Sequence, residues 1–232
     1  MTKNIFPLQG IIGIVGNHPN EVDLAVDCNL KCVEVRSDLL INAGFSVDQV
    51  LEIVASARQK ELGCLVTHRR VDHGGKFSGS EQDRVDFCLR AVAAGAQIID
   101  AEWDSESGEK LIAEGVPTIL SYHDFHGMTE AAELQHITDI MLAKQPAALK
   151  VVPTASCIAD SARMLHWVAD RNDGPVRIGF AMGAAGEISR VITLKAGAPI
   201  TYASFGQSVA PGQISIEDLQ SLYQIEGLNP GQ

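Results

Sequence analysis

Short apolar runs rich in Val and Ile alternate along the whole chain with segments in which apolar residues recur at helical spacing. This alternation predicts βα units whose strands form a parallel sheet. The predicted strands cover residues 10–16, 31–36, 63–68, 97–101, 117–122, 147–152, 176–181 and 199–204. Eight strands and 232 residues match a (β/α)₈ TIM barrel. A doubly wound open sheet is the alternative.

Two segments between these strands each carry a single apolar stripe, at residues 47–54 and 85–92. Apolar residues at i, i+3, i+4 and i+7 form one face of a helix, so both stripes predict helices that pack on the sheet. Ser46 and Gln49 form a capping box at the start of the first helix. Because no Pro/Gly/Ser-rich linker divides the chain, residues 1–232 are predicted to form one domain.

Composition narrows the classes of function. The formal net charge is −11, from 18 basic and 29 acidic residues, so the polyanionic surface of a nucleic acid would be repelled. No apolar stretch reaches the roughly 18 residues of a membrane span, and residues 1–7 lack the apolar core of a signal peptide. We therefore predict a cytoplasmic protein that binds neither nucleic acid nor membranes. Five scattered cysteines without a Cys-x-x-Cys motif predict neither a disulfide framework nor a zinc site.

The candidate chemistry centres on Lys150, which lies inside the apolar run 147–152. Burial disfavours the charged form of an amine and lowers its pKa, so this lysine is a candidate nucleophile that attacks a carbonyl to form a Schiff base. His123 ends the preceding apolar run. A neutral imidazole, with an ordinary pKa of roughly 6.5, can remove a C–H proton beside the resulting iminium. The alternatives are a lysine whose head extends into water and a histidine that only ties its loop in place.

Polar residues concentrate at the carboxyl ends of the predicted strands, which is where a parallel barrel carries its active site. Tight metal-ligand spacing such as His-x-x-x-His does not occur, and neither does a nucleotide-binding Gly-x-Gly-x-x-Gly motif, so no metal and no cofactor are predicted. The strand-end residues are Glu34, Arg36, His68, Arg69, Asp100, Glu102, His123 and Asp124.

Two later loops are candidate substrate contacts. Residues 182–190 contain a Gly-x-x-Gly turn and end in Arg190, and they would present backbone N–H groups to a carboxylate or phosphate at a helix start. Such turns are also common in ordinary loops. The Pro-Gly turn in 210–213 would place Gln213 over the barrel mouth as part of a lid, with an ordinary exposed turn as the alternative.

Six separated motifs occur in a fixed order: Val33–Arg36, Thr67–Arg69 with Gly74-Gly75, Ser121–Phe125, Leu149–Pro153, Met182-Gly183 through Ser189-Arg190, and Ala210–Gln213. Together they resemble type I 3-dehydroquinate dehydratase over nearly the whole chain. The resemblance implies a (β/α)₈ barrel that usually pairs as a homodimer. It also implies dehydration of 3-dehydroquinate to 3-dehydroshikimate in aromatic amino-acid biosynthesis, the shikimate pathway, without metal or cofactor.

The resemblance also implies a role for each site residue. Lys150 would form the imine with the substrate ketone, and His123 would abstract the adjacent proton and return it to the departing hydroxyl. A guanidinium is suited to bidentate binding of the substrate carboxylate. The implied substrate-binding residues are Glu34, Arg36 and Arg69 at the ring hydroxyls and their surroundings, and Arg190 and Gln213 at the carboxylate.

The chain departs from the family pattern at two positions. His73 occurs where many members carry Glu, so a carboxylate partner for the catalytic histidine is either missing or supplied by Asp72 or Asp100. Val209 replaces a serine that could grip the carboxylate, with Ser208 as a substitute one position earlier. Because the nucleophile and the base remain, we predict an active enzyme with a reduced rate or substrate affinity.

Two other functions stay open from the sequence. A class I aldolase also uses a lysine on a barrel strand, although such enzymes often act on phosphorylated sugars and this chain has no dedicated phosphate loop. A non-catalytic descendant that senses a pathway metabolite is compatible with the substitutions at positions 73 and 209.

Overall fold

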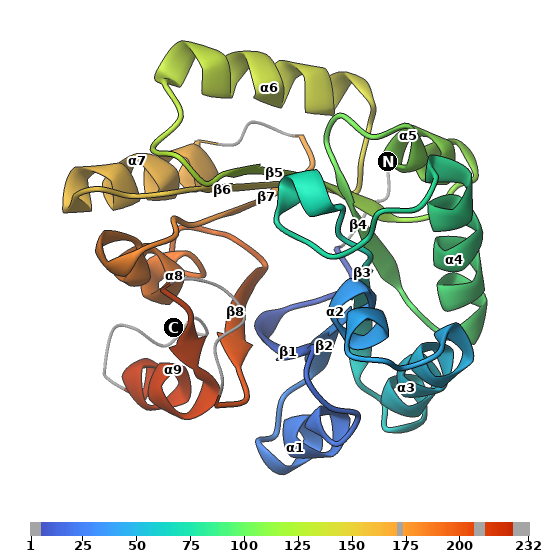
Figure 1. Cartoon of the computed structure of the whole chain (residues 1–232). Helices are drawn as coiled ribbons and strands as arrows, with labels where there is room; N and C mark the ends of the chain where they lie inside the picture. Colours follow the sequence, from blue (N-terminus) through green and yellow to red (C-terminus); the bar gives the residue numbers. More distant parts are fainter. Residues whose placement is uncertain (1–5, 171–173, 207–211, 225–232) are drawn as a thin grey trace.

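The computed structural model describes residues 6–170, 174–206 and 212–224, and its strands form one curled parallel sheet (Figure 1). All eight predicted strands are present within two residues of their predicted bounds, and a two-residue ninth strand was not predicted. The strands are β1 (Gly10–Val15), β2 (Cys32–Arg36), β3 (Gly63–Thr67), β4 (Ile98–Glu102), β5 (Thr118–Asp124), β6 (Ala148–Pro153), β7 (Val176–Gly179), β8 (Ile200–Ser204) and β9 (Ile214–Ser215).

The strands follow one another around the sheet in the order β7-β6-β5-β4-β3-β2-β1-β8-β9. This is the cyclic order of a (β/α)₈ barrel, and it excludes a doubly wound sheet, whose chain order reverses at a switch point. Within the described residues, no ladder joins β7 to β8, and β9 pairs with the outer edge of β8 instead. The predicted TIM-barrel fold is therefore confirmed, as a single curled sheet with helices outside it (Figure 1).

The two helices with predicted apolar stripes are α3 and α4, and the capping box of Ser46 and Gln49 is present at the start of α3. In the described part of the chain, no helix is long and apolar enough to cross a membrane. The helices are α1 (Glu21–Asp27), α2 (Ser37–Asn42), α3 (Val47–Gln59), α4 (Glu81–Ala94), α5 (Glu106–Ala113), α6 (Ala131–Ala143), α7 (Ile158–Ala169), α8 (Glu187–Ile192) and α9 (Ile216–Tyr223), with 3₁₀ turns at Val71–His73 and Ala184–Gly186.

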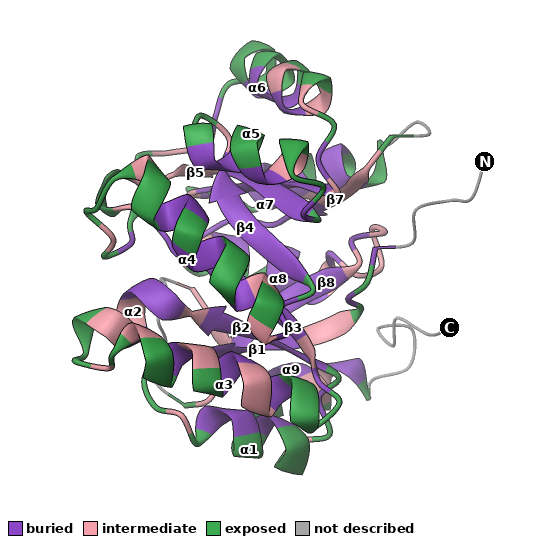
Figure 2. Cartoon of the chain, turned by 90° about the vertical axis from the view of Figure 1, so that its right-hand side faces the viewer, coloured by how far each residue is buried: buried purple, intermediate pink, exposed green. Residues whose placement is uncertain are grey.

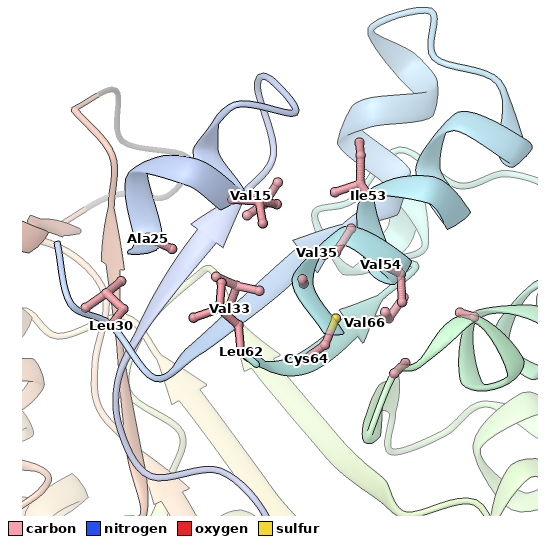
Figure 3. Close-up of a cluster of buried hydrophobic side chains, with 14 of the residues drawn as sticks. Val15, Ala25, Leu30, Val33, Val35, Ile53, Val54, Leu62, Cys64 and Val66 are labelled. Atoms are coloured by element: carbon pink, nitrogen blue, oxygen red, sulfur yellow. The ribbon is translucent and has the colours of Figure 1, made fainter. Parts of the chain in front are cut away.

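Alternate side chains of each strand point outward and pack against the helices. In the cluster shown in Figure 3, Val33, Val35 and Val66 from the strands meet Ile53 and Val54 from α3. Full burial of each such side chain contributes about 1.5 to 3 kcal/mol to folding. As a result, α3 and α4 are buried on the side that faces the sheet and exposed on the other (Figure 2).

The interior of the barrel changes from apolar to polar along the strands. Near the amino ends, the inward residues of β3, β4, β5 and β6 are apolar and fully buried, and they form one interior cluster. One pleat further, each of these strands carries a polar residue on the same face. The apolar residues are Leu65, Ile98, Ile119 and Ala148, and the polar ones that follow are Thr67, Asp100, Ser121 and Lys150. An apolar floor therefore supports a polar layer at the carboxyl ends.

Candidate active site

A cavity of about 160 Å³ opens above this polar layer. Its lining includes most of the sequence-predicted site residues. It also includes His73, Phe125, Phe180 and Tyr202, for which no contact with substrate was predicted. The predicted residues that line it are Glu34, Arg36, Arg69, His123, Lys150 and Arg190. The structure thus brings together residues that are up to 156 positions apart, between 34 and 190.

Lys150 is the third residue of β6, and strand alternation directs it into the barrel, where the residue is 5% exposed. Its Nζ lies 3.0 Å from Oδ2 of Asp100 and 4.3 Å from the ring centroid of Tyr202. The alternative of a lysine head that extends into water is therefore wrong. Its surroundings are not apolar alone, because a carboxylate and an aromatic face both stabilise its cation.

Asp100 connects the nucleophile to its surroundings. Its Oδ1 accepts hydrogen bonds from Nη2 of Arg69 at 2.8 Å and from the Ser121 hydroxyl at 2.6 Å, while Oδ2 faces Lys150. Burial alone would raise the pKa of Asp100, but Arg69 and Lys150 outweigh it and lower the pKa to about 2. Asp100 is therefore ionised at neutral pH and holds two cations in fixed positions.

His123 lies on β5, next to β6, on the same inward face as Lys150. Register places Ser121 opposite Lys150 and His123 opposite Val152, so the histidine lies one pleat nearer the barrel mouth. Its Nδ1 is 3.4 Å from Nη1 of Arg69, a contact too long to fix the tautomer of the ring. Burial, followed by the charges of Arg69 and Lys150, lowers the pKa of His123 well below 6.5. The ring is therefore neutral at pH 7 and has a lone pair for accepting a proton.

His123 has no direct contact with either carboxylate that the sequence offered as its partner. Asp72 pairs with Arg70 at 2.8 Å, and Asp100 reaches the ring only through Arg69. Of the sequence alternatives, the missing carboxylate is the one that the structure supports. His73 lies in a 3₁₀ turn at the cavity wall, with its Nε2 3.4 Å from Oδ1 of Asp104.

The remaining charged residues form the walls. Arg36 makes a two-pronged ion pair with Asp38, at 2.9 and 2.8 Å. Glu34 accepts a 2.6 Å hydrogen bond from the Thr67 hydroxyl. Arg190, at 3% exposure, lies with its guanidinium 4.4 Å from the ring centroid of Phe180. Burial lowers the pKa of Arg190 to about 10, so it stays charged at neutral pH.

The predicted anion cradle in residues 182–190 is only partly present. Two of its amides are already paired within the protein, because the N–H of Met182 donates to the carbonyl of Pro153 at the end of β6 at 2.8 Å and that of Gly186 donates to the carbonyl of Gly183 at 2.9 Å. The Ser189 hydroxyl accepts from the N–H of Ala181. Met182 and Arg190 are the residues of this segment that line the cavity, and Arg190 supplies its charged group.

Three further predictions about the site have different outcomes in the structure. Gln213 is half-buried just before β9 and is not among the residues that line the cavity, so its contact with substrate stays a prediction. Ser208 and Val209 lie outside the described residues, as do Ala210 and Pro211 of the predicted lid. His68 follows β3 but faces away from the cavity, because its ring packs between Phe77 and Phe87.

Comparison with known proteins agrees with this geometry. Residues 15–230 match the family model for type I 3-dehydroquinase. The 3-dehydroquinate dehydratase of Methanopyrus kandleri is 33% identical over 203 residues, which cover 88% of this chain and 91% of that protein. That of Dehalococcoides mccartyi is 33% identical over 165 residues, covering 69% and 74%. The crystal structure of 3-dehydroquinate dehydratase from Geobacillus kaustophilus has the same fold, with a TM-score of 0.81 at 22% identity over 94% of this chain and 90% of that one. The chain therefore belongs to the type I 3-dehydroquinase family of carbon–oxygen lyases.

Proposed function

We propose that this enzyme dehydrates 3-dehydroquinate to 3-dehydroshikimate through an imine on Lys150, with His123 as the general base and acid. One observation carries the proposal. A buried amine and a neutral imidazole line one cavity, from the same face of two adjacent strands. An amine that forms an iminium and a base that removes the neighbouring proton are the two groups that this elimination needs.

The first step is deprotonation of Lys150, because an ammonium in an ion pair with Asp100 has no lone pair with which to attack. Asp100, with a pKa of about 2, is a weak base, so we assign the proton to the neutral imidazole of His123, which lines the same cavity. The amine adds to the substrate ketone, and His123 returns the proton to the carbinolamine hydroxyl. That hydroxyl leaves as water, and the nitrogen becomes an iminium.

The second step is the elimination. The iminium withdraws electrons and acidifies the adjacent C–H, whose proton passes to His123 and leaves an enamine. The enamine electrons expel the hydroxyl one carbon further on, and His123 donates its proton so that water departs. Hydrolysis of the conjugated iminium then frees Lys150 and releases the product. Each proton that His123 takes is returned, so the residue is unchanged after one turnover.

Substrate binding in this proposal depends on the walls of the cavity. The buried guanidinium of Arg190 binds the substrate carboxylate, and the low-dielectric surroundings strengthen that ion pair. Glu34 and Arg36 face the ring hydroxyls as acceptor and donor. Fixing the ring in this way aligns its reactive C–H with His123 before the chemistry begins. Gln213 would contact the substrate carboxylate after a movement toward the mouth of the barrel.

The direct test is the ultraviolet absorbance of the conjugated enone when the protein meets 3-dehydroquinate. Lys150→Met should abolish the rise in absorbance. Lys144→Met is the matched control, because Lys144 pairs with Glu109 on α5, outside the catalytic cavity, and its loss should leave the rate near that of the parent enzyme. Substantial turnover by Lys150→Met would overturn the assigned nucleophile. An inactive parent enzyme that still binds the substrate would favour the sensor.

The family resemblance also supports a homodimer in the cytoplasm, which we include in the proposal. Sedimentation at micromolar concentration tests the dimer, and a monomer across that range would contradict it.

The aldolase alternative predicts cleavage of a carbon–carbon bond, so it would produce two smaller fragments instead of the enone.

A further inference from the structure

A second cavity, of about 330 Å³, shares a wall with the catalytic one. The segment 68–79 forms that wall, because Arg69 and His73 line the catalytic cavity whereas His68 and Phe77 line the second. The second cavity is about twice the volume of the first. It plays no part in the proposed dehydration, and no residue of the mechanism points into it.

His68 gives this cavity a hydrogen-bond acceptor. The Ser37 hydroxyl donates to the carbonyl of Thr67 at 2.9 Å, so its oxygen accepts from Nδ1 of His68, also at 2.9 Å. Burial lowers the pKa of His68 to about 4, which keeps the ring neutral with its proton on Nδ1. Nε2 then carries a lone pair, and among the described residues no group donates to it. An acceptor without a protein donor, on a ring that lines the cavity, favours a ligand that supplies a donor.

The rest of the lining calls for an uncharged, flat ligand. The buried carboxylate of Asp38 is already satisfied by Arg36 and by the N–H of Lys76 at 3.1 Å. Asp83 and Lys76 have opposite charges and are exposed at the rim. Asn42 and Ser78 add neutral polar groups, and the apolar and aromatic lining comes from Ile41, Val47, Phe77 and the buried Phe87.

We propose that this cavity binds a small neutral aromatic molecule with one hydroxyl or N–H donor, and that the donor bonds to Nε2 of His68. Size permits it, since an apolar cavity of about 150 Å³ is enough to hold benzene. Edge contacts with Phe77 and Phe87 would hold the ring, while the hydrogen bond selects among rings of equal size.

Phenol and toluene are the matched probes, because they have the same shape and differ in one donor. Calorimetric titration of the intact enzyme, without substrate, should give saturable binding that is about fivefold tighter for phenol, the gain expected from one net hydrogen bond. Toluene is the more hydrophobic of the two, so a purely apolar cavity would reverse the order. Equal affinities, a preference for toluene or no binding of either probe would overturn the proposal.

Separate measurements test whether the ligand binds in this cavity, next to His68. Phenol should move the ¹⁵N resonance of Nε2 in His68, and toluene should not. Val47→Phe fills the cavity from α3 and should abolish phenol binding while turnover is retained. Leu24→Phe, on the exposed side of α1, is the control and should bind phenol like the parent enzyme. Unchanged phenol binding in folded Val47→Phe, or an unchanged His68 resonance at saturation, would place the ligand elsewhere and refute the site.

Discussion

Asp100→Asn tests how the polar layer of the barrel is held together. The substitution keeps the shape of the side chain but removes the charge that holds Arg69 and Lys150, at 2.8 and 3.0 Å. Both cations would remain buried, with exposures of 4% and 5%. Removing one partner of a buried ion pair costs about 3 to 5 kcal/mol, because the other charge is left uncompensated. An asparagine side chain still offers an oxygen to one of the two cations, which reduces that cost.

The lowered pKa of Asp100 gives a second, independent value for the stability that this carboxylate contributes. A folded-state pKa of about 2, against 3.8 for the unperturbed group, means that folding favours the ionised form. The shift corresponds to about 2.5 kcal/mol of stability above pH 4. Since the pKa is lowered, this contribution is lost as the pH falls toward 2, and about half of it remains at pH 3. Asp100→Asn should therefore lose about 2 to 4 kcal/mol of unfolding free energy at pH 7 and clearly less at pH 3.

Urea unfolding followed by circular dichroism at both pH values measures the difference. Asp48→Asn is the control, because Asp48 forms an exposed ion pair with Arg90, and such surface pairs contribute less than about 1 kcal/mol. A loss below 1 kcal/mol in Asp100→Asn at pH 7 would refute the reasoning. A loss of unfolding free energy that is as large at pH 3 as at pH 7 would refute it too.

Three further predictions concern catalysis. His123→Ala should lose turnover and form the reducible adduct with the substrate more slowly than the parent enzyme, with solvent in place of the imidazole as the proton acceptor. Near-normal activity in steady-state assays would remove the imidazole from the mechanism. Arg190→Ala should raise KM roughly 10- to 150-fold, the loss of a charge-assisted bond worth about 1.5 to 3 kcal/mol, whereas an unchanged KM would contradict the carboxylate contact. The lowered pKa of His123 keeps it neutral as the pH falls through 6.5, so kcat/KM should stay level down to about pH 6. A half-maximal loss at pH 6.5 or above would show that the imidazole titrates as it does in water.

The sequence predicts the strands well for a physical reason. A parallel strand is covered on both faces, so it appears in the sequence as a continuous apolar run. Such a run can be recognised without knowing which elements pack against it. The two-residue strand at Ile214–Ser215 has no such run, since it is too short to show a period. The strand ends also identify part of the catalytic cavity, because the carboxyl ends of all barrel strands meet at one mouth. Of the eight strand-end residues, four line it: Glu34, Arg36, Arg69 and His123.

Pairing between distant side chains could not be predicted in the same way. Lys150 and Asp100 are 50 residues apart, and nothing in either local sequence reveals that strand register brings them to 3.0 Å. His68 was grouped with the site because it follows a strand, but neighbouring residues point to opposite sides of an extended chain, so Arg69 enters the catalytic cavity and His68 the second one. Gln213 depends on a loop conformation that no periodic pattern encodes.

Borohydride trapping tests the central claim most directly. Incubation with 3-dehydroquinate, reduction and proteolysis should yield one modified peptide, with the adduct on the Nζ of Lys150, and the Lys144→Met control should give the same peptide. A ligand-derived mass on a different lysine, or the absence of any adduct in an enzyme that turns over, would contradict the imine at this position.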